Sequence, residues 1–275
     1  MLDILFSMRR LLFPFLIALC LASIAHIETK GFSPGAIRTF LSEKEEAPLP
    51  KEFEAIFQRP FHYIGKGRQC FVFASEDEKY VLKFFNKRYL EMPWYAFAIK
   101  KKERSKRDLR RHFFEHSYEI ARLEFGEEIL YLHKGKTNAL PIIKTVGPAT
   151  LAFEIDLNQT PFVLQRKGEP FYAGLEAVFA GKGMEGLVKE IDAFAAQVRE
   201  RILRGIVDGD SDVEHNWGYI GEKIFHLDPG RLYYDPRLKS LQRQKEEWET
   251  SVRAFAKWLE KHHPEAMGHL QNPFL

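Results

Sequence analysis

The sequence predicts an α+β fold with two lobes: a first lobe built on a β-sheet and a small, mainly helical second lobe, preceded by an N-terminal hydrophobic helix. Two observations predict it. Short aromatic and β-branched runs separated by turn residues occupy the first half of the chain, whereas apolar residues at helical spacing dominate the second half. At 275 residues with 45% hydrophobic content, the chain can bury two modest cores.

The N-terminus predicts a targeting segment. Met8-Arg9-Arg10 precedes an apolar run at 11–25 that ends in small residues of the kind a signal peptidase accepts. The run is shorter than the ~20 residues that a spanning helix needs. Residues 1–28 are therefore expected to be a signal peptide or a membrane anchor, with a buried helix or a specialised secretion signal as alternatives. The protein is then membrane-associated or secreted, on a side of the membrane that the sequence does not fix.

Charge and cysteine content exclude two classes of protein. The 41 basic and 38 acidic residues leave a net charge of +3, so no nucleic-acid partner is expected from charge. Of the two cysteines, Cys20 lies inside the N-terminal apolar run and leaves Cys70 alone in the remainder. A structural disulfide framework is therefore excluded.

Residues 29–51 are polar, carry several prolines and are expected to be a linker. The first lobe, residues 52–167, begins with the strand-like runs FHYIG, CFVFAS and KYVLKFF. After a helical stretch at 99–125, it continues with ALPIIKTVG, TLAFEIDL and PFVLQRK. These runs predict an antiparallel sheet of about five strands that is interrupted by helix.

The second lobe, residues 168–275, begins with apolar residues at helical spacing, which predict a long helix ending near Gly205. A small hairpin is expected around Gly221, and a last amphipathic helix from Leu238 to about His262. A mainly helical lobe follows from these elements.

Gly65, Gly67, Val72 and Lys83 follow one another along the first strands of the predicted sheet. The phosphates of a nucleotide need close backbone approach, which glycines permit, and a cation held on a rigid strand. The order therefore predicts a phosphate-binding loop, with Lys83 at the phosphates. One alternative is an ordinary hairpin with a solvent-exposed lysine. A dinucleotide-binding fold would need a helix directly after the glycines, where CFVFAS is typical of a strand.

Acidic and amide side chains follow the long helix, in the order Asp208, Asp210, Asp212, Asn216 and Asp228. Phosphoryl transfer needs a carboxylate beside the attacking hydroxyl and oxygen ligands for Mg²⁺. The segment therefore predicts a catalytic and metal-binding loop. The alternatives are a structural acidic turn or a calcium loop, although the glycine and glutamate that an EF-hand needs at its sixth and twelfth positions are missing.

Together, these two groups of residues resemble the two halves of a divergent bacterial member of the protein-kinase-like superfamily. The segment from Gly65 to Val72 resembles the G-x-G-x-x-G-x-V loop, with Cys70 in place of the third glycine, and Lys83 resembles the phosphate-binding lysine. Asp208-Gly209-Asp210 stands where H-R-D is expected, and Asp228-Pro229-Gly230 resembles D-F-G. No A-P-E element follows, so a minimal second lobe is expected.

The resemblance implies ATP and Mg²⁺ as cofactors and a role for each matching residue. The nucleotide-binding residues would be Gly65, Gly67, Val72, Lys83, Glu119 and Gln165. The catalytic residues would be Asp210, as the base, and Lys83, and Asp212 is the alternative base. The metal ligands would be Asn216 and Asp228. Lys83 would be oriented by Glu119 on the following helix, or by Glu115 one turn earlier.

The function expected from this resemblance is an ATP- and Mg²⁺-dependent phosphotransferase whose acceptor is a protein side chain or the hydroxyl of a sugar or lipid. Two alternatives remain: a pseudokinase that binds nucleotide or serves as a scaffold or regulator at a membrane or after secretion, and an unrelated binding protein of the cell envelope. The basic tract at 100–111 is either a solvated helix face or a contact with anionic lipid headgroups.

Overall fold

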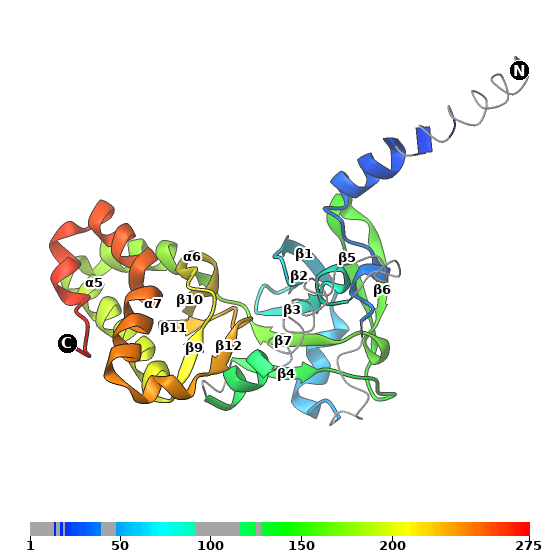
Figure 1. Ribbon diagram of the computed structural model, residues 1–275. Helices are drawn as coiled ribbons and strands as arrows, with labels where there is room; N and C mark the ends of the chain where they lie inside the picture. Colours follow the sequence, from blue (N-terminus) through cyan, green and yellow to red (C-terminus); the bar gives the residue numbers. More distant parts are fainter. Residues whose placement is uncertain (1–13, 15–16, 19, 40–47, 92–115, 125–127) are drawn as a thin grey trace, which may run out of the picture. The chain divides into compact units, whose positions relative to one another are not determined.

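The computed structural model describes residues 14, 17–18, 20–39, 48–91, 116–124 and 128–275. Contacts divide the chain into two compact units (Figure 1). The first unit contains Met1–Ile99 and Tyr131–Gln165, and the second contains Lys100–Leu130 and Arg166–Leu275. Helical residues 116–124, which the sequence placed in the first lobe, group with the second unit.

A seven-stranded sheet is the main element of the first unit, with the strand order β4-β7-β3-β2-β1-β5-β6. Its strands are β1 (Phe61–Lys66), β2 (Cys70–Ser75), β3 (Tyr80–Phe85), β4 (Ile129–His133), β5 (Ile142–Val146), β6 (Ala152–Asp156) and β7 (Phe162–Arg166). β1, β2 and β3 pair antiparallel in sequence, and β5 and β6 form a second antiparallel pair.

The predicted sheet of about five antiparallel strands is wrong in size and in one pairing. β4 was not assigned from the sequence, because a short apolar run cannot be told from a helix segment by periodicity alone. β5 pairs with β1 in parallel, which joins segments far apart in the chain. Such a crossover leaves no local sequence signal.

Aromatic side chains pack against this sheet. The rings of Phe73 and Phe84 lie 5.6 Å apart in an edge-to-face arrangement, and those of Phe84 and Phe162 lie 6.4 Å apart. All three are fully buried and come from three different strands, β2, β3 and β7. Aromatic pairs of this geometry stabilise a core beyond the area that they bury, so β2 and β3 form a rigid support.

The second unit combines helices with two small sheets. Its helices are residues 116–124, α5 (Phe171–Leu203), α6 (Val213–Asn216) and α7 (Leu241–His262). Its strands are β8 (Glu169–Pro170), β9 (Ile206–Asp208), β10 (Trp217–Ile220), β11 (Lys223–His226) and β12 (Leu232–Tyr234). They form the sheets β11-β10-β8 and β12-β9. The predicted long helix, hairpin and last amphipathic helix are all present.

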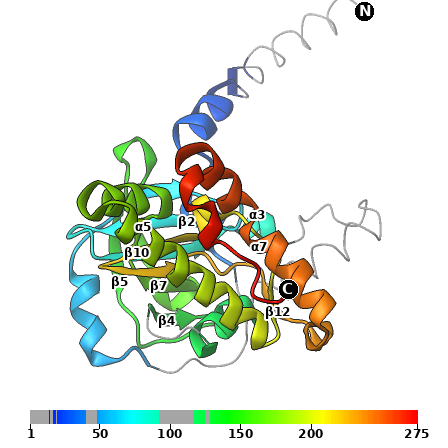
Figure 2. The ribbon, with the colours of Figure 1, turned by 90° about the vertical axis from the view of Figure 1, so that its left-hand side faces the viewer.

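α5 and α7 lie side by side in the second unit, as Figure 2 shows. Apolar residues of α5 recur at helical spacing and are buried, at Leu187, Ile191, Phe194, Val198 and Ile202. The ring of Phe194 lies 4.9 Å from that of Phe255 on α7. The helical periodicity of the sequence therefore forms the core that supports the loop after α5.

Glycines with positive φ set the two chain reversals around that loop. Gly205 (φ +79°) follows the end of α5 and turns the chain into β9. Gly221 (φ +62°) is the first residue of the two-residue turn between β10 and β11, as a type II′ hairpin requires. Both turns fix where the segment from Asp208 to Asp228 begins and returns.

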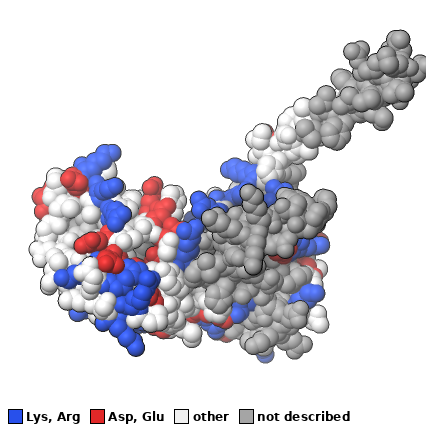
Figure 3. Space-filling view, viewed as in Figure 1, with Lys and Arg blue, Asp and Glu red and all other residues white. Residues whose placement is uncertain are grey.

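Shorter elements complete the described chain. They are α2 (Pro34–Ile37), α3 (Lys87–Leu90) and the 3₁₀ helices η1 (Lys51–Gln58), η3 (Pro148–Thr150), η4 (Leu157–Gln159), η5 (Pro236–Lys239) and η6 (Pro264–His269). Basic and acidic side chains both occur on the face seen in Figure 3, in keeping with the near balance of charge.

Residues 20–28 of the N-terminal segment are helical, and the side chains of Leu21, Ile24 and Ile27 are exposed. In the part of the chain that the structure describes, no helix is long and apolar enough to cross a membrane. Three parts of the sequence for which predictions were made lie outside the described residues. They are most of positions 11–19 in the apolar run, the basic tract at 100–111, and Glu115. The predictions made for them remain predictions.

Candidate functional site

The first predicted group of residues forms a row across three neighbouring strands. Gly65 on β1 pairs with Val72 on β2, and Val72 pairs with Lys83 on β3. Residues directly opposite one another in an antiparallel pair project from the same face of the sheet. Val72 and Lys83 therefore share a face, and Gly65 leaves that face without a side chain next to Val72.

The space over the glycines is open. Among the described residues, a Cβ placed on Gly65 would meet no atom within 4 Å, and one on Gly67 would meet only the carbonyl oxygen of Cys70, at 3.9 Å. Neither glycine has a positive φ, so neither is needed for an unusual backbone conformation. What they provide is unobstructed access to the backbone. Cys70, which replaces the third glycine of the motif, begins β2 and is buried.

Lys83 does not point into solvent as an ordinary surface lysine would. It is 7% exposed, in the middle of β3. Lysine is rarely buried to this degree unless it has a partner or a function, so the alternative of a solvated strand lysine is wrong. Gln165 is buried on β7, the strand next to β3.

In the second unit, Asp208 is a buried carboxylate at the end of β9. Its Oδ1 accepts a hydrogen bond from the backbone N–H of Asp210 at 2.9 Å. Its Oδ2 lies 3.0 Å from Nε2 of His226 on β11 and 3.7 Å from Nη1 of Arg201 on α5. Burial opposes ionisation of Asp208, but His226, Arg201 and the N–H of Asp210 together hold its pKa below the usual value. Asp208 is thus a charged structural anchor for the turn that carries Asp210.

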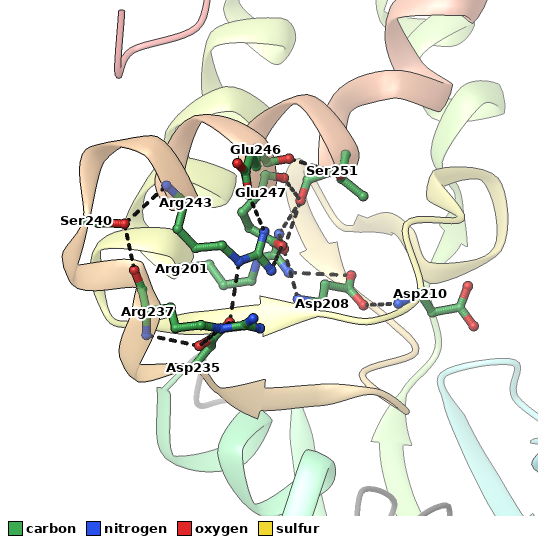
Figure 4. A network of polar contacts seen from close by, with 11 residues as sticks. Arg201, Asp208, Asp210, Asp235, Arg237, Ser240, Arg243, Glu246, Glu247 and Ser251 are labelled. Atoms are coloured by element: carbon green, nitrogen blue, oxygen red, sulfur yellow. Dashed lines mark hydrogen bonds and ion pairs between the residues drawn. The ribbon is translucent and has the colours of Figure 1, made fainter. Parts of the chain in front are cut away.

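Glu247 on α7 supports the same turn from the other side. Its Oε1 accepts the backbone N–H of Asp208 at 3.1 Å, and Arg201 donates to it from Nη2 at 3.3 Å (Figure 4). Burial raises the pKa of Glu247, and its contact with Arg201 offsets part of that rise. Arg201 also donates to the hydroxyl of Ser251. The network joins α5, α7 and β9 below the predicted catalytic loop.

Asp210 and Asp212, the two candidates for the catalytic base, have different surroundings. Asp212 caps α6 by accepting the N–H of His215, and its Oδ2 lies 2.9 Å from Nδ1 of the same histidine. Asp210 is 40% exposed, and its carboxylate lies 3.6 Å from Nε of Arg231. Both carboxylates are partly exposed, with 40% of the side chain of Asp210 and 48% of that of Asp212 accessible, but the helix cap accounts for Asp212, whereas Asp210 is held through its backbone.

Asn216 links Asp210 to Asp228. Its Nδ2 donates to the backbone carbonyl of Asp210 at 2.8 Å, while its own backbone carbonyl accepts the N–H of Asp228 at 3.2 Å. The hydroxyl of Tyr118 donates to Oδ1 of Asp228 at 3.1 Å. The structure therefore brings Asp208, Asp210, Asn216 and Asp228 together in one hydrogen-bonded chain within the second unit.

The oxygen atoms of these hydrogen-bonded residues are of the kind that binds magnesium. Mg²⁺ takes oxygen ligands and commonly uses one or two protein groups together with substrate phosphates. Asp228 offers a carboxylate. The hydrogen bond from Nδ2 of Asn216 to the carbonyl of Asp210 fixes the orientation of the Asn216 amide, so its Oδ1 points away from that carbonyl. Among the described residues, no three His, Cys, Asp or Glu side chains gather in a way that could hold a metal by themselves. A site here would rest on Asp228, Asn216 and phosphate oxygens.

Four residues of the site escaped the sequence analysis: Tyr118, Arg201, His226 and Glu247. Each lies on a predicted helix or hairpin and contacts Asp208 or Asp228. Arg201 stands seven residues before Asp208, whereas the other three contacts join residues at least 18 positions apart. His226 carried a usable signal, because it stands two residues before Asp228. Glu119 follows Tyr118 on helical residues 116–124, and its predicted pairing with Lys83, which belongs to the other unit, stays a prediction.

Comparison with known proteins adds little to this geometry. No protein-family model matches the chain, and no curated protein matches its sequence. Among solved structures it is similar to WbdD, described as a bifunctional kinase-methyltransferase. A co-crystal structure of WbdD with the kinase inhibitor LY294002 matches at 14% identity with a TM-score of 0.39, over 76% of this chain and 44% of that one.

Two further WbdD structures give the same picture. A medium-resolution structure matches at 14% identity with a TM-score of 0.36, over 74% of this chain and 42% of that one. A low-resolution structure matches at 20% identity with a TM-score of 0.32, over 63% and 30%. The chain thus spans less than half the length of the WbdD chains. Similarity at this level assigns neither activity nor substrate, so the chemistry of the site rests on the contacts described above.

Proposed function

We propose that this chain is a kinase-like phosphotransferase that uses ATP and Mg²⁺. The observation that carries the proposal is the hydrogen-bonded chain of Asp208, Asp210, Asn216 and Asp228 in one unit. It links Asp210, with a partly exposed carboxylate, to an amide and a carboxylate that would supply oxygen ligands to Mg²⁺, and transfer of a phosphoryl group to a hydroxyl requires groups of both kinds. Asn216 and Asp228 would hold Mg²⁺, which would supply positive charge beside the phosphates.

Each residue has a defined task in this proposal. Asp210 accepts the proton of the acceptor hydroxyl, Asn216 and Asp228 supply metal ligands, and Lys83 binds the phosphates. Gly65 and Gly67 let the backbone approach the phosphates, while Val72 and Gln165 line the nucleotide site. Glu119 orients Lys83. Asp212 serves as a helix cap, so we assign the base to Asp210 on the contacts of the two residues.

The acceptor is a protein side chain or the hydroxyl of a sugar or lipid. Residues 1–28, as a signal or anchor, and the basic tract at 100–111 would bring the enzyme to a membrane, which favours an acceptor found there. Protease accessibility of a C-terminal tag in intact cells would identify the side of the membrane that the enzyme occupies.

Nucleotide binding and turnover by the full-length protein test the proposal. We expect Mg²⁺-dependent binding of ATP, and transfer of the γ-phosphate to water, to the protein itself or to an added acceptor. Asp210→Asn should lower turnover by about 10²–10⁴-fold with nucleotide affinity kept, because a general base acts in the transition state. Asp212→Asn is the matched control and should keep most of the activity. Turnover at the parent rate in Lys83→Met and Asp228→Asn would refute the proposal that the protein is a phosphotransferase.

One observation favours the pseudokinase alternative. Arg231 lies 3.6 Å from the carboxylate of Asp210 and competes with an acceptor hydroxyl for it. A pseudokinase would bind ATP with normal dependence on Lys83 and transfer no phosphate. Arg231→Ala separates the two cases: an enzyme held back by this ion pair gains turnover, whereas a pseudokinase stays inactive.

A further inference from the structure

Two consecutive side chains of helical residues 116–124 hold the segment that carries the proposed metal ligand Asp228. The hydroxyl of Tyr118 donates to Oδ1 of Asp228 at 3.1 Å. The hydroxyl of Ser117 donates to the backbone carbonyl of Leu232 at 3.0 Å. Both residues are buried, Tyr118 to 1% exposure, and both contacts lie within the second unit.

Packing fixes this helix in place. Ile120 and Ala121 form a buried cluster with Ile206 of β9 and Leu232 of β12. Ile206 and Leu232 belong to the two strands of the β12-β9 sheet, whose register also pairs Leu232 with Asp208. The helix therefore rests on the same sheet that positions the Asp208 turn.

The far end of the helix is tied down as well. Glu124 accepts a hydrogen bond from the hydroxyl of Tyr234 at 2.6 Å and pairs with Arg204 at 3.1 Å. With apolar contacts in the middle and polar ties at both ends, the backbone under Tyr118 has little freedom. Its hydroxyl is consequently presented to Asp228 from a fixed direction.

We propose that Tyr118 is a positioning residue for the metal-binding carboxylate of Asp228, and that Ser117 steadies the same segment at Leu232. The inference rests on the proposed function and deepens it. A donor on Oδ1 restricts rotation of the carboxylate and so fixes the direction in which its oxygens face a cation. Hydrogen bonds to the ligands of a metal orient them, and their loss typically lowers metal affinity 10–100-fold.

Metal binding, measured without turnover, tests the role of Tyr118. Mn²⁺ is titrated into the full-length protein in the presence of a non-hydrolysable ATP analogue and followed by electron paramagnetic resonance. Tyr118→Phe removes only the hydroxyl. We expect the Kd for Mn²⁺ to rise about tenfold, the lower end of the range for such residues. Nucleotide affinity in the presence of EDTA should stay that of the parent.

Tyr234→Phe is the matched control, because it removes a tyrosine hydroxyl bonded to a carboxylate at the other end of the same helix. Because Arg204 still pairs with Glu124, this variant should change the Kd for Mn²⁺ much less than Tyr118→Phe does. Ser117→Ala should raise it less than Tyr118→Phe does. In turnover, Tyr118→Phe should raise the KM for Mg²⁺ more than it lowers kcat at saturating metal.

The outcomes separate the two proposals. The positioning role of Tyr118 is overturned if Tyr118→Phe binds Mn²⁺ like the parent, or if Tyr118→Phe and Tyr234→Phe lose Mn²⁺ affinity equally. In either case, Asp228→Asn still tests the proposed metal site. If the parent itself binds no Mn²⁺ with nucleotide, the proposed function and this inference both fail. If the melting temperature of a variant lies within a few degrees of the parent value, its loss of Mn²⁺ affinity is not caused by unfolding.

Discussion

The side-chain amide of Asn216 donates to the backbone carbonyl of Asp210 at 2.8 Å, and so ties a proposed metal ligand to the proposed base. The two residues belong to one short segment in which α6 separates Asp210 from β10. Because Asn216 also accepts the N–H of Asp228 on its carbonyl, a change at this position reaches both sides of the site.

Asn216→Asp tests that link. The aspartate keeps an oxygen ligand but replaces the amide donor with a carboxylate facing a carbonyl oxygen. We expect the free energy of unfolding to fall by about 1–3 kcal/mol, the cost of an unmatched buried polar group, and phosphate transfer to be lost. Urea denaturation and turnover are the measurements.

Asn158→Asp is the matched control for Asn216→Asp. Asn158 lies in the first unit and likewise donates from Nδ2 to a backbone carbonyl, that of Leu140 at 2.7 Å, and also to Oδ1 of Asp156 at 2.9 Å. Because the new carboxylate would also face Asp156, a loss of stability at least as large as that of Asn216→Asp is expected, with activity retained. Loss of activity in both variants to the same degree would show that stability alone explains the effect of Asn216→Asp.

Arg201→Met tests the buried network under the catalytic loop. It removes the cation shared by Asp208 and Glu247 and leaves both carboxylates buried without it. Breaking a buried ion pair by removing one partner costs about 3–5 kcal/mol. We expect a loss of that size in urea denaturation.

Arg204→Met, on the same helix one turn later, is the control for Arg201→Met. Arg204 pairs with Glu124 and Glu200 at the surface, with 39% of its side chain exposed. Surface ion pairs contribute about 0–1 kcal/mol. If both variants lost the same free energy of unfolding, burial of the ion pairs around Asp208 would not add to their contribution to stability.

Local patterns predicted most elements of the fold but not the full sheet. The runs CFVFAS and KYVLKFF became β2 and β3, and the apolar spacing from Leu187 to Ile202 became α5. The β1–β5 pairing and the strand β4 were missed, because parallel pairing and short edge strands depend on contacts made across the chain.

The candidate site shows the same division. The order of Gly65, Val72 and Lys83 predicted a group that the strand register does place in one row. The sequence could not predict that Asp208 would pair with His226, or that Tyr118 would bond to Asp228. Those contacts join segments whose separation along the chain carries no periodic signal.

Gly65→Val tests the open space beside Val72. Because a Cβ at Gly65 meets no atom of the described part of the chain within 4 Å, the free energy of unfolding should change by less than about 1 kcal/mol. The new side chain occupies the face that the nucleotide is proposed to use. We expect ATP affinity to fall about tenfold, equivalent to ~1.4 kcal/mol.

Gly218→Ala gives the opposite pattern and is the control for Gly65→Val. A Cβ at Gly218 would overlap the carbonyl oxygen of Glu169 and the side chain of Leu227. Stability should fall by about 1–3 kcal/mol. A Gly65→Val protein that is destabilised as much as Gly218→Ala, or that binds ATP like the parent, contradicts the open phosphate-binding loop.

The last prediction concerns pH and His133 on β4. This histidine is fully buried, with its ring centroid 5.5 Å from that of Phe162, and burial lowers its pKa from 6.5 to about 4. Between these two values the unfolded chain binds a proton that the folded protein does not. The free energy of unfolding should therefore fall as the pH drops from about 6.5 to 4, by up to about 3 kcal/mol from this residue.

Urea denaturation at pH 7, 6 and 5 measures this slope. His133→Phe removes the titrating group and should flatten the decline, even though the variant can differ from the parent in stability at pH 7. His269→Gln, which replaces an exposed histidine, should keep the parent slope. If His133→Phe loses stability with falling pH as steeply as the parent, protonation of His133 is not the cause of the decline.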